Sequence, residues 1–152
     1  MDNNTSITTT DPEETQKFAA RLAATLKKEK GSTTIPTVVC LYGDLGSGKT
    51  TFVQGFAREL GIQNRLLSPT FIIVRRYQIP QSESLLYHVD LYRTKTSYDI
   101  ENLGFLEILE DPQGYVLIEW AEKLGSLLPQ KRTDIHFVTN QDDTHTIIMK
   151  RT

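Results

Sequence analysis

The sequence lacks most of the features that mark secreted, disulfide-rich or membrane proteins. It has one cysteine, Cys40, which excludes an internal disulfide and fits a reducing compartment. The first ten residues contain no lysine or arginine and almost no apolar residue, so no secretory signal is predicted. The longest apolar runs, such as 38–42, are strand-sized and far shorter than the roughly 20 residues that span a bilayer. We therefore expect a cytoplasmic protein without a membrane segment.

An excess of charge of one sign is also missing. The 17 lysine and arginine residues are balanced by 19 aspartate and glutamate residues, which gives a formal net charge of −2. Such a chain has no overall positive field that would attract nucleic acid or an anionic membrane. With 152 residues, of which 38% are hydrophobic, the composition is that of an ordinary globular protein. The sequence predicts a single domain over 1–152, with the Asn- and Thr-rich residues 1–10 as a flexible tail.

The order of the apolar patterns predicts an α/β protein. After the capping residue Asp11 and Pro12, apolar residues recur at helical spacing until Gly31. Helical patterns cover 12–30, 49–60 and, more weakly, 96–110, and strand patterns cover 37–42, 71–77, 85–90, 115–119, 134–139 and 144–150. Helices and strands alternate early in the chain, whereas hairpins are expected in the middle and at the end. The sequence therefore predicts a mixed sheet.

The strongest motif is the glycine-rich segment GDLGSGKT, residues 43–50, which matches G-x-x-x-x-G-K-[ST] between a predicted strand and a predicted helix. Its small residues allow successive backbone N–H groups to face phosphate oxygens. Lys49 brings a positive charge to the β- and γ-phosphates, and the Thr50 hydroxyl can bind Mg²⁺. The candidate nucleotide-binding residues of this segment are Asp44, Gly46, Ser47, Gly48, Lys49, Thr50 and Thr51.

The motif also sharpens the predicted architecture. A P-loop NTPase-like fold has three layers, with helices on both faces of the sheet, and its ligand lies outside the carboxyl ends of the strands. We therefore expect an α/β fold of that type, with a mixed, largely parallel central sheet and antiparallel hairpins.

Two acidic residues follow buried-strand patterns and can complete a magnesium site. Asp90 comes after the apolar run 85–89, and Glu119 comes after 115–118. A phosphate loop needs a carboxylate at the end of a neighbouring strand to help to hold Mg²⁺. Each acid can also be a solvated strand end or a cap of the next helix. The residues alone leave open which of the two serves the metal.

Other features of the sequence carry weaker signals. His88 alternates with Asp90 along one strand, and we interpret it as a hydrogen-bonded core histidine rather than a catalytic base. The segment 68–70, Ser-Pro-Thr, is typical of a turn, and its hydroxyls are also candidates for a mobile loop near the γ-phosphate. Arg93 is a candidate for a surface ion pair or a phosphate contact. Trp120, the only tryptophan, is a core residue or a wall of the nucleotide site.

Several short segments extend the phosphate-loop motif in a fixed order along nearly the whole chain. They are PEET at 12–15, GDLGSGKTTF at 43–52, SPTF at 68–71, HVDLYR at 88–93, LG at 103–104 with Glu107, EW at 119–120 with Glu122, and LP at 128–129. Together they resemble the TsaE family, the bacterial ATPases of tRNA threonylcarbamoyladenosine biosynthesis. The chain departs from this pattern at Ser47, where alanine is common, and at 144–146, Thr-His-Thr, where members often have an arginine.

The resemblance implies roles for particular residues. Thr50 and Glu119 would bind Mg²⁺, and Asp90 would lie near the γ-phosphate of ATP and support hydrolysis, which makes Lys49, Asp90 and Glu119 the expected catalytic residues. Thr15 would approach the adenosine, and the segment 68–70 would act as a switch loop. The implied partners are TsaB and TsaD, which place the threonylcarbamoyl group on tRNA, so that tRNA is reached indirectly through the complex.

Two other functions compete with a partner-dependent ATPase. A P-loop small-molecule kinase usually has several arginines on a lid that grips the acceptor, and the sequence contains no arginine-rich lid segment. A nucleotide-regulated interaction protein would bind ATP and its partners with little need for hydrolysis. A GTPase is disfavoured because the chain has no Asn-Lys-x-Asp segment.

Overall fold

The computed structural model describes residues 1–66 and 73–152, and within them one mixed sheet separates two helical layers. Its strands are β1 (Asn4–Thr9), β2 (Thr37–Tyr42), β3 (Val74–Gln78), β4 (Leu85–Asp90), β5 (Tyr115–Glu119), β6 (Thr133–Thr139) and β7 (His145–Arg151). Its α-helices are α1 (Pro12–Glu29), α2 (Lys49–Glu59), α3 (Ser97–Glu101) and α4 (Phe105–Ile108), and its 3₁₀ segments are η1 (Lys30–Ser32) and η2 (Ala121–Leu127). None of the helices in these two ranges is long and apolar enough to cross a membrane.

The strand order across the sheet is β1-β7-β6-β2-β5-β4-β3. The central pairs β6–β2, β2–β5 and β5–β4 are parallel, whereas β1–β7, β7–β6 and β4–β3 are antiparallel. The expected α/β fold, with a largely parallel centre and antiparallel hairpins, is therefore confirmed. The carboxyl ends of β2, β4 and β5 meet at one edge of the sheet because these three strands run in the same direction.

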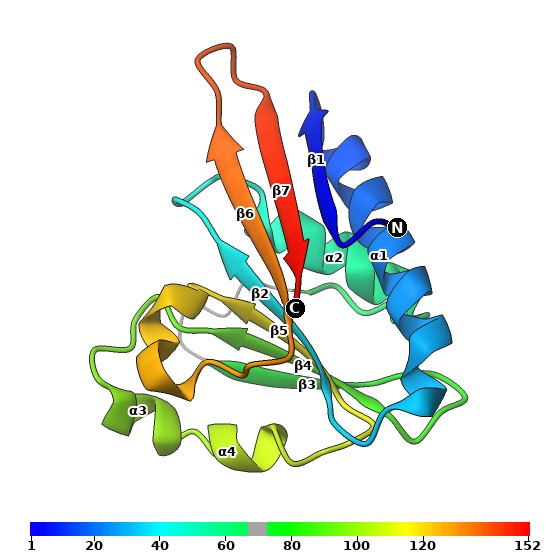
Figure 1. Ribbon diagram of the computed structural model, residues 1–152, viewed down its shortest axis with the longest axis vertical. Helices are drawn as coiled ribbons and strands as arrows, with labels where there is room; N and C mark the ends of the chain where they lie inside the picture. Colours follow the sequence, from blue (N-terminus) through cyan, green and yellow to red (C-terminus); the bar gives the residue numbers. More distant parts are fainter. Residues whose placement is uncertain (67–72) are drawn as a thin grey trace.

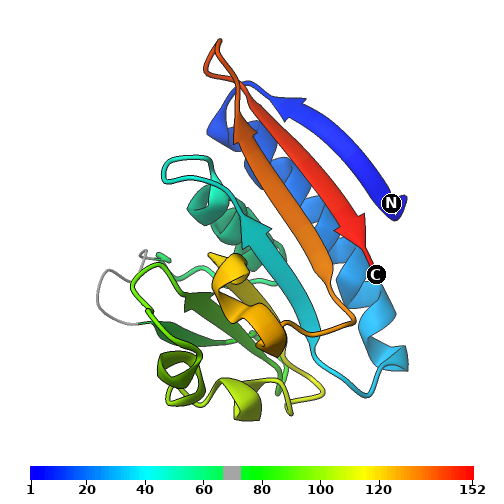
Figure 2. The same ribbon diagram turned by 60° about the vertical axis from the view of Figure 1, so that its left-hand side comes forward.

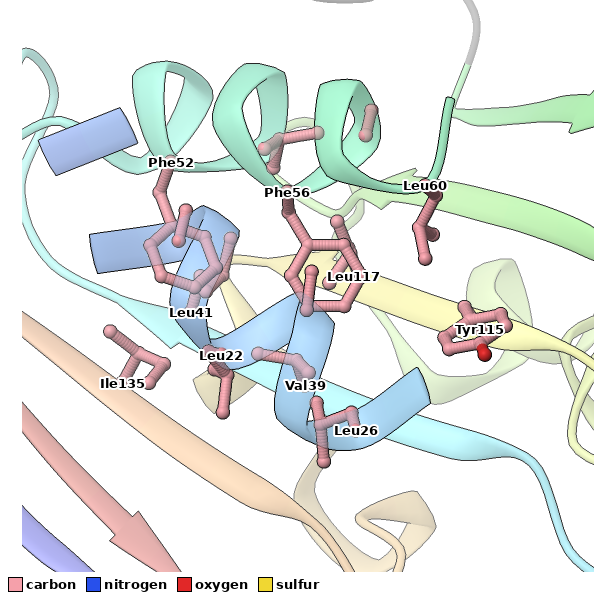
Figure 3. Close-up of a cluster of buried hydrophobic side chains, with 14 of the residues drawn as sticks. Leu22, Leu26, Val39, Leu41, Phe52, Phe56, Leu60, Tyr115, Leu117 and Ile135 are labelled. Atoms are coloured by element: carbon pink, nitrogen blue, oxygen red, sulfur yellow. The ribbon is translucent and has the colours of Figure 1, made fainter. Parts of the chain in front are cut away.

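Helices cover both faces of the sheet. Helices α1 and α2 pack on one face, and α3, α4 and η2 pack on the other (Figures 1 and 2). The first layer encloses a cluster of buried side chains that includes Leu22, Leu26, Val39, Leu41, Phe52, Phe56, Leu60, Tyr115, Leu117 and Ile135 (Figure 3). The alternation of side chains along β2 sends Val39 and Leu41 into this cluster and Val38 and Cys40 into the second one.

The prediction of a flexible tail over residues 1–10 is wrong. Residues Asn4–Thr9 form β1, which pairs antiparallel with β7 along its whole length. Three threonines and Ile7 suit a strand, because β-branched side chains pack well on a pleated surface. Ile7 packs against the first core cluster, and the pairing satisfies the backbone groups of β7 that would otherwise form an exposed edge.

The predicted helices and hairpins are largely where the sequence places them. Helix α1 begins at Pro12, and the Asp11 side chain caps it by accepting a hydrogen bond of 2.9 Å from the backbone N–H of Glu14. The weak helical pattern over 96–110 forms two short helices, which are separated at Gly104 by a positive φ of 75°. The strand predicted over 71–77 is seen as β3 from Val74, and its residues 71–72 lie outside the described ranges.

Candidate functional site

The candidate site lies at the edge where three parallel strands end. Glu119, the last residue of β5, is in register with Leu41 of β2 and with Asp90 of β4. The segment 43–48 leaves β2 at this edge and leads directly into α2. The sheet therefore brings the glycine-rich motif, Asp90 and Glu119 side by side, although the two acids are separated in the sequence by an α3–α4 connection.

A cavity of about 690 Å³ opens above this edge, and we call it the phosphate-loop cavity. Its volume lies within the range of roughly 300–1,000 Å³ that is usual for small-molecule sites. Eight of the predicted site residues line it: Thr15, Gly46, Gly48, Lys49, Thr50, Thr51, Asp90 and Glu119. The other two, Asp44 and Ser47, do not line it: Asp44 is exposed and Ser47 is buried.

The loop holds glycines with positive φ angles, and one of them, Gly46, leaves open space at the cavity. Gly46 and Gly48 have φ angles of 77° and 109°, which L side chains rarely adopt. A Cβ atom built on Gly46 meets no atom of the described residues within 4 Å, and Gly46 lines the cavity. Helix α2 begins at Lys49 with Gly48 as its N-cap, so no side chain of the cap residue occupies the first N–H groups of the helix. These N–H groups and the helix dipole favour an anion at this end.

Lys49 places a buried ammonium group at the same end of the cavity. Its Nζ donates to the backbone carbonyls of Gly43 and Asp44, and lies 4.4 Å from the centre of the Trp120 ring. Burial lowers the pKa of Lys49, and the nearby carboxylates, chiefly that of Glu119, oppose this effect. A bound phosphate would favour the charged form of this lysine, because it would supply an opposite charge to a group that has lost most of its water.

Glu119 and Thr50 form the candidate metal site. The Thr50 hydroxyl donates to Glu119 Oε1 over 3.1 Å, and the Glu119 side chain is 3% exposed. A hydroxyl and a carboxylate are hard oxygen ligands of the kind that Mg²⁺ takes from proteins. Within the described residues, no group of three or more His, Cys, Asp or Glu side chains could hold a metal ion. A Mg²⁺ ion at this pair would take its remaining ligands from nucleotide phosphates and water, as is usual for this ion.

Asp90 lies beside this pair, and its carboxylate accepts its hydrogen bond from another residue than Thr50. Its Oδ1 accepts a hydrogen bond of 3.0 Å from the backbone N–H of Tyr92, and its side chain is half-buried on the cavity wall. Burial raises the pKa of Asp90, and the neighbouring Glu119 carboxylate acts in the same direction. The structure thus separates the two acids that the sequence left equivalent, because Glu119 alone holds the Thr50 hydroxyl.

The far end of the cavity is formed by residues that the sequence did not predict as site residues, although 144–146 was noted as a segment where TsaE members often have an arginine. They are Thr10, Asp11 and Pro12 at the start of α1, and Asp143 and His145 in the β6–β7 hairpin. Figure 1 shows the hairpin turn and the β1–α1 connection at the same end of the sheet. Thr15 is buried there, with its hydroxyl 3.0 Å from that of Thr9. No sequence pattern marks these residues as a set, because the β1–β7 pairing brings them together.

The residues with weaker sequence signals lie at or near the same site. Trp120 is half-buried on the cavity wall, and its ring centre lies 5.0 Å from that of Tyr92, which the sequence did not single out. Arg93 also lines the cavity. His88 is fully buried, as predicted, with its Nε2 atom 2.6 Å from Glu119 Oε2. The predicted switch loop over 68–70 lies outside the described residues.

Comparisons with known proteins agree on one family. The sequence model described as "Threonylcarbamoyl adenosine biosynthesis protein TsaE" matches residues 9–147. The tRNA threonylcarbamoyladenosine biosynthesis protein TsaE of Bacillus subtilis is 40% identical over 139 residues, which are 91% of this chain and 80% of that protein. That of Rickettsia bellii is 37% identical over 132 residues, 86% of this chain and 84% of that protein.

A solved structure agrees with these sequence matches. The crystal structure of Bacillus subtilis YdiB superposes with a TM-score of 0.75 and 34% sequence identity, over 99% of this chain and 87% of that one. The two proteins are therefore similar in sequence as well as in fold. On these matches, the chain belongs to the TsaE family of tRNA threonylcarbamoyladenosine biosynthesis proteins.

Proposed function

We propose that the chain binds ATP with Mg²⁺ in the phosphate-loop cavity and hydrolyses it slowly in support of tRNA threonylcarbamoyladenosine synthesis. The observation that carries this proposal is the hydrogen bond from Thr50 to Glu119 beside the buried Lys49 ammonium, at the open end of a glycine-rich loop. This arrangement offers a positive charge, backbone N–H groups and hard oxygen ligands to one triphosphate.

Different residues of the chain would bind the phosphates, the Mg²⁺ ion and the nucleoside. The N–H groups at the start of α2 and the Lys49 ammonium would hold the β- and γ-phosphates, while Thr50 and Glu119 would hold Mg²⁺. When it is bound, Mg²⁺ offsets the negative charge of the phosphates. The sugar and base would extend toward Thr15 and the β6–β7 hairpin, since the cavity continues in that direction.

Asp90 is the candidate for hydrolysis. It lies on the cavity wall next to Glu119 and does not engage Thr50, so its carboxylate can orient a water molecule. Burial raises the pKa of Asp90, so its carboxylate is a better proton acceptor than a fully solvated one. Lys49, Asp90 and Glu119 are therefore the proposed catalytic residues.

Slow turnover and stimulation by partners follow from the charges of the site. Arg93 is the only arginine among the described residues that line the cavity, and it is exposed. An arginine that stabilises the transferred phosphoryl group is worth about 10³–10⁵ in rate where it has been measured. We propose that TsaB and TsaD supply such an arginine or order Arg93 against the phosphates, and that tRNA is engaged through their complex.

The test is calorimetry of ATP binding with and without Mg²⁺, followed by phosphate release from the chain alone and with TsaB and TsaD. We expect ATP binding that Mg²⁺ strengthens, slow release alone, and faster release with both partners. A folded chain that does not bind ATP would refute the proposal. Rapid turnover that the partners do not change would refute the proposed stimulation, and transfer of the γ-phosphate to a small metabolite would favour a kinase. Partner binding that depends on ATP but is indifferent to hydrolysis would favour a nucleotide-regulated interaction protein.

A further inference from the structure

A buried histidine holds the second oxygen of the Glu119 carboxylate. His88 lies on β4 in register with Leu117 of β5, two residues before Glu119 on the neighbouring strand. Residues at such diagonal positions lie on the same face of a sheet and within reach of long side chains. His88 Nε2 lies 2.6 Å from Glu119 Oε2, while the Thr50 hydroxyl donates to Oε1. Each carboxylate oxygen of Glu119 thus has its own hydrogen-bond partner, Thr50 for Oε1 and His88 for Oε2.

The other ring nitrogen shows which atom donates. His88 is 0% exposed, and its Nδ1 atom has no hydrogen-bond partner among residues 1–66 and 73–152. A proton on Nδ1 would be a buried donor without an acceptor, which is costly to maintain. The tautomer that carries its proton on Nε2 leaves only a lone pair at Nδ1 and points its N–H at the carboxylate. His88 therefore donates to Glu119 Oε2.

This donor restricts the direction of the glutamate side chain. Glu119 ends its strand, and three rotatable bonds separate its carboxylate from the backbone. With Oε2 held by His88, Oε1 is directed toward Thr50, where the proposed Mg²⁺ would lie. Residues behind a metal ligand commonly orient it in this way, and their loss typically weakens metal binding about 10- to 100-fold.

We propose that His88 is a positioning residue that sets the Mg²⁺ affinity of the nucleotide site by holding Glu119 Oε2. The proposal rests on the proposed function, because it assumes that Glu119 and Thr50 hold the metal. It does not require His88 to touch the nucleotide or to exchange a proton. It distinguishes His88 from a core residue that merely fills space, because only the N–H donor at the Nε2 position matters.

A matched pair of variants separates these two roles. In His88→Gln the amide nitrogen can reach the position of Nε2 and donate to Glu119. His88→Met has nearly the same length and volume but has no donor. If His88 only packs, both variants disturb the site similarly. If it positions Glu119, Gln restores what Met loses.

The measurement is the gain in ATP affinity that Mg²⁺ produces, obtained by calorimetry in Mg²⁺ and in EDTA. We expect His88→Met to lose about 10- to 100-fold of this gain while its affinity in EDTA stays close to that of the wild type, and His88→Gln to keep most of the gain. An unchanged gain in His88→Met, or equal losses in both variants, would overturn the role of His88. A wild type whose ATP affinity does not respond to Mg²⁺ would overturn the proposed metal site as well.

A second measurement needs neither nucleotide nor a variant. Nitrogen-15 chemical shifts of the histidine rings in the ligand-free protein report which ring nitrogen carries the proton. We expect a proton on Nε2 of His88. An Nε2 atom without a proton would overturn the proposal even if the chain binds ATP, because His88 could then not donate to Glu119.

Discussion

The Lys49 ammonium lies 4.4 Å from the centre of the Trp120 indole ring, and both residues line the phosphate-loop cavity. Trp120 reaches this position because the chain turns immediately after Glu119, where Trp120 has a φ of 60° and caps η2. A cation over an indole face is attracted by the ring, by about 0.5–2 kcal/mol depending on how much water is excluded. A phosphate that draws the ammonium toward itself would therefore alter the surroundings of the indole.

The first prediction uses this relationship. Lys49→Met removes the ammonium and keeps an apolar stem of similar length, so the fold should remain intact. Loss of a charge-assisted contact to phosphate should weaken ATP binding by about 10- to 100-fold, which corresponds to roughly 1.5–3 kcal/mol. Calorimetry measures the affinity, and circular dichroism checks the fold.

The fluorescence of Trp120 gives a second reading of the same event. Because the chain has one tryptophan, an ATP-dependent change in emission reports on this site alone. We expect the change in the wild type and a much smaller one in Lys49→Met at the same ATP concentration. A folded Lys49→Met variant with unchanged affinity would contradict the assignment of the phosphate loop.

The second prediction concerns the two acids. Glu119→Gln removes the charge that faces Thr50, so it should weaken Mg²⁺ binding, and excess Mg²⁺ should restore part of the ATP hydrolysis. Asp90→Asn removes a carboxylate that accepts from the backbone of Tyr92 rather than from the Thr50 hydroxyl, so its hydrolysis should fall without this rescue. Phosphate release measured across a Mg²⁺ series checks both variants. Equal rescue in both, or rescue of Asp90→Asn alone, would reverse the roles that we assign to them.

The sequence predicts correctly those elements whose structure is determined by residues close to them in the chain. Helix α1 could be predicted because Asp11, Pro12 and the helical spacing of apolar residues act within a few residues. Strand β1 could not, because its strand state depends on pairing with β7 at the other end of the chain. Polar threonines next to an N-terminus resemble a frayed tail when that partner is unknown.

The candidate site shows the same division. The spacing of residues in the motif around Lys49 is enough to predict a phosphate-binding loop. The acids at the strand ends could be predicted because the carboxyl ends of parallel strands lie at the same edge of the sheet. Asp143 could not be found, and His145 was noted only within 144–146, where TsaE members often have an arginine, since their approach to α1 is produced by the whole β1–β7–β6 arrangement. His88 was placed correctly in the core, but its partner Glu119 depends on the register between β4 and β5.

The third prediction tests how closely α1 and α2 approach. A Cβ atom on Gly55 of α2 would lie 2.5 Å from both Cα and O of Gln16 in α1, which are backbone atoms that cannot rotate away. Gly55→Ala should therefore destabilise the protein by about 1–3 kcal/mol, despite the better helix propensity of alanine. For a chain of this size, each kcal/mol lowers the melting temperature by about 2–4 °C.

Gly31→Ala is the matched control for this prediction. A Cβ atom on Gly31 meets no described atom within 4 Å, so the same chemical change should leave the melting temperature unchanged or raise it slightly. Thermal unfolding followed by circular dichroism compares the two variants. If Gly55→Ala melts at or above the temperature of the wild type, the helices can separate more easily than this contact implies.

The last prediction concerns Lys30, which caps the C-terminal end of α1 and does not line the phosphate-loop cavity. Its side chain is 6% exposed, and its Nζ donates to the carbonyl of Gly114 over 2.8 Å and to that of Ile35 over 3.3 Å. Burial lowers the pKa of Lys30 from 10.5 to about 8, and the Asp111 carboxylate opposes this only in part. Between pH 8 and 10.5 the unfolded chain therefore binds more protons at this lysine than the folded chain does.

The contribution of Lys30 to the free energy of unfolding must then increase with pH across this window. The increase is at most about 1.4 kcal/mol per pH unit for one proton. Below pH 8 the lysine is charged in both states and contributes no pH dependence. Lys30→Met removes the titration, so the free energy of unfolding of the wild type relative to Lys30→Met should increase between pH 7.5 and 9.5. Urea denaturation at both pH values measures this difference, with Lys27→Met as a control that removes an exposed lysine from the same helix. A difference between wild type and Lys30→Met that is the same at both pH values would mean that burial does not shift the pKa of Lys30.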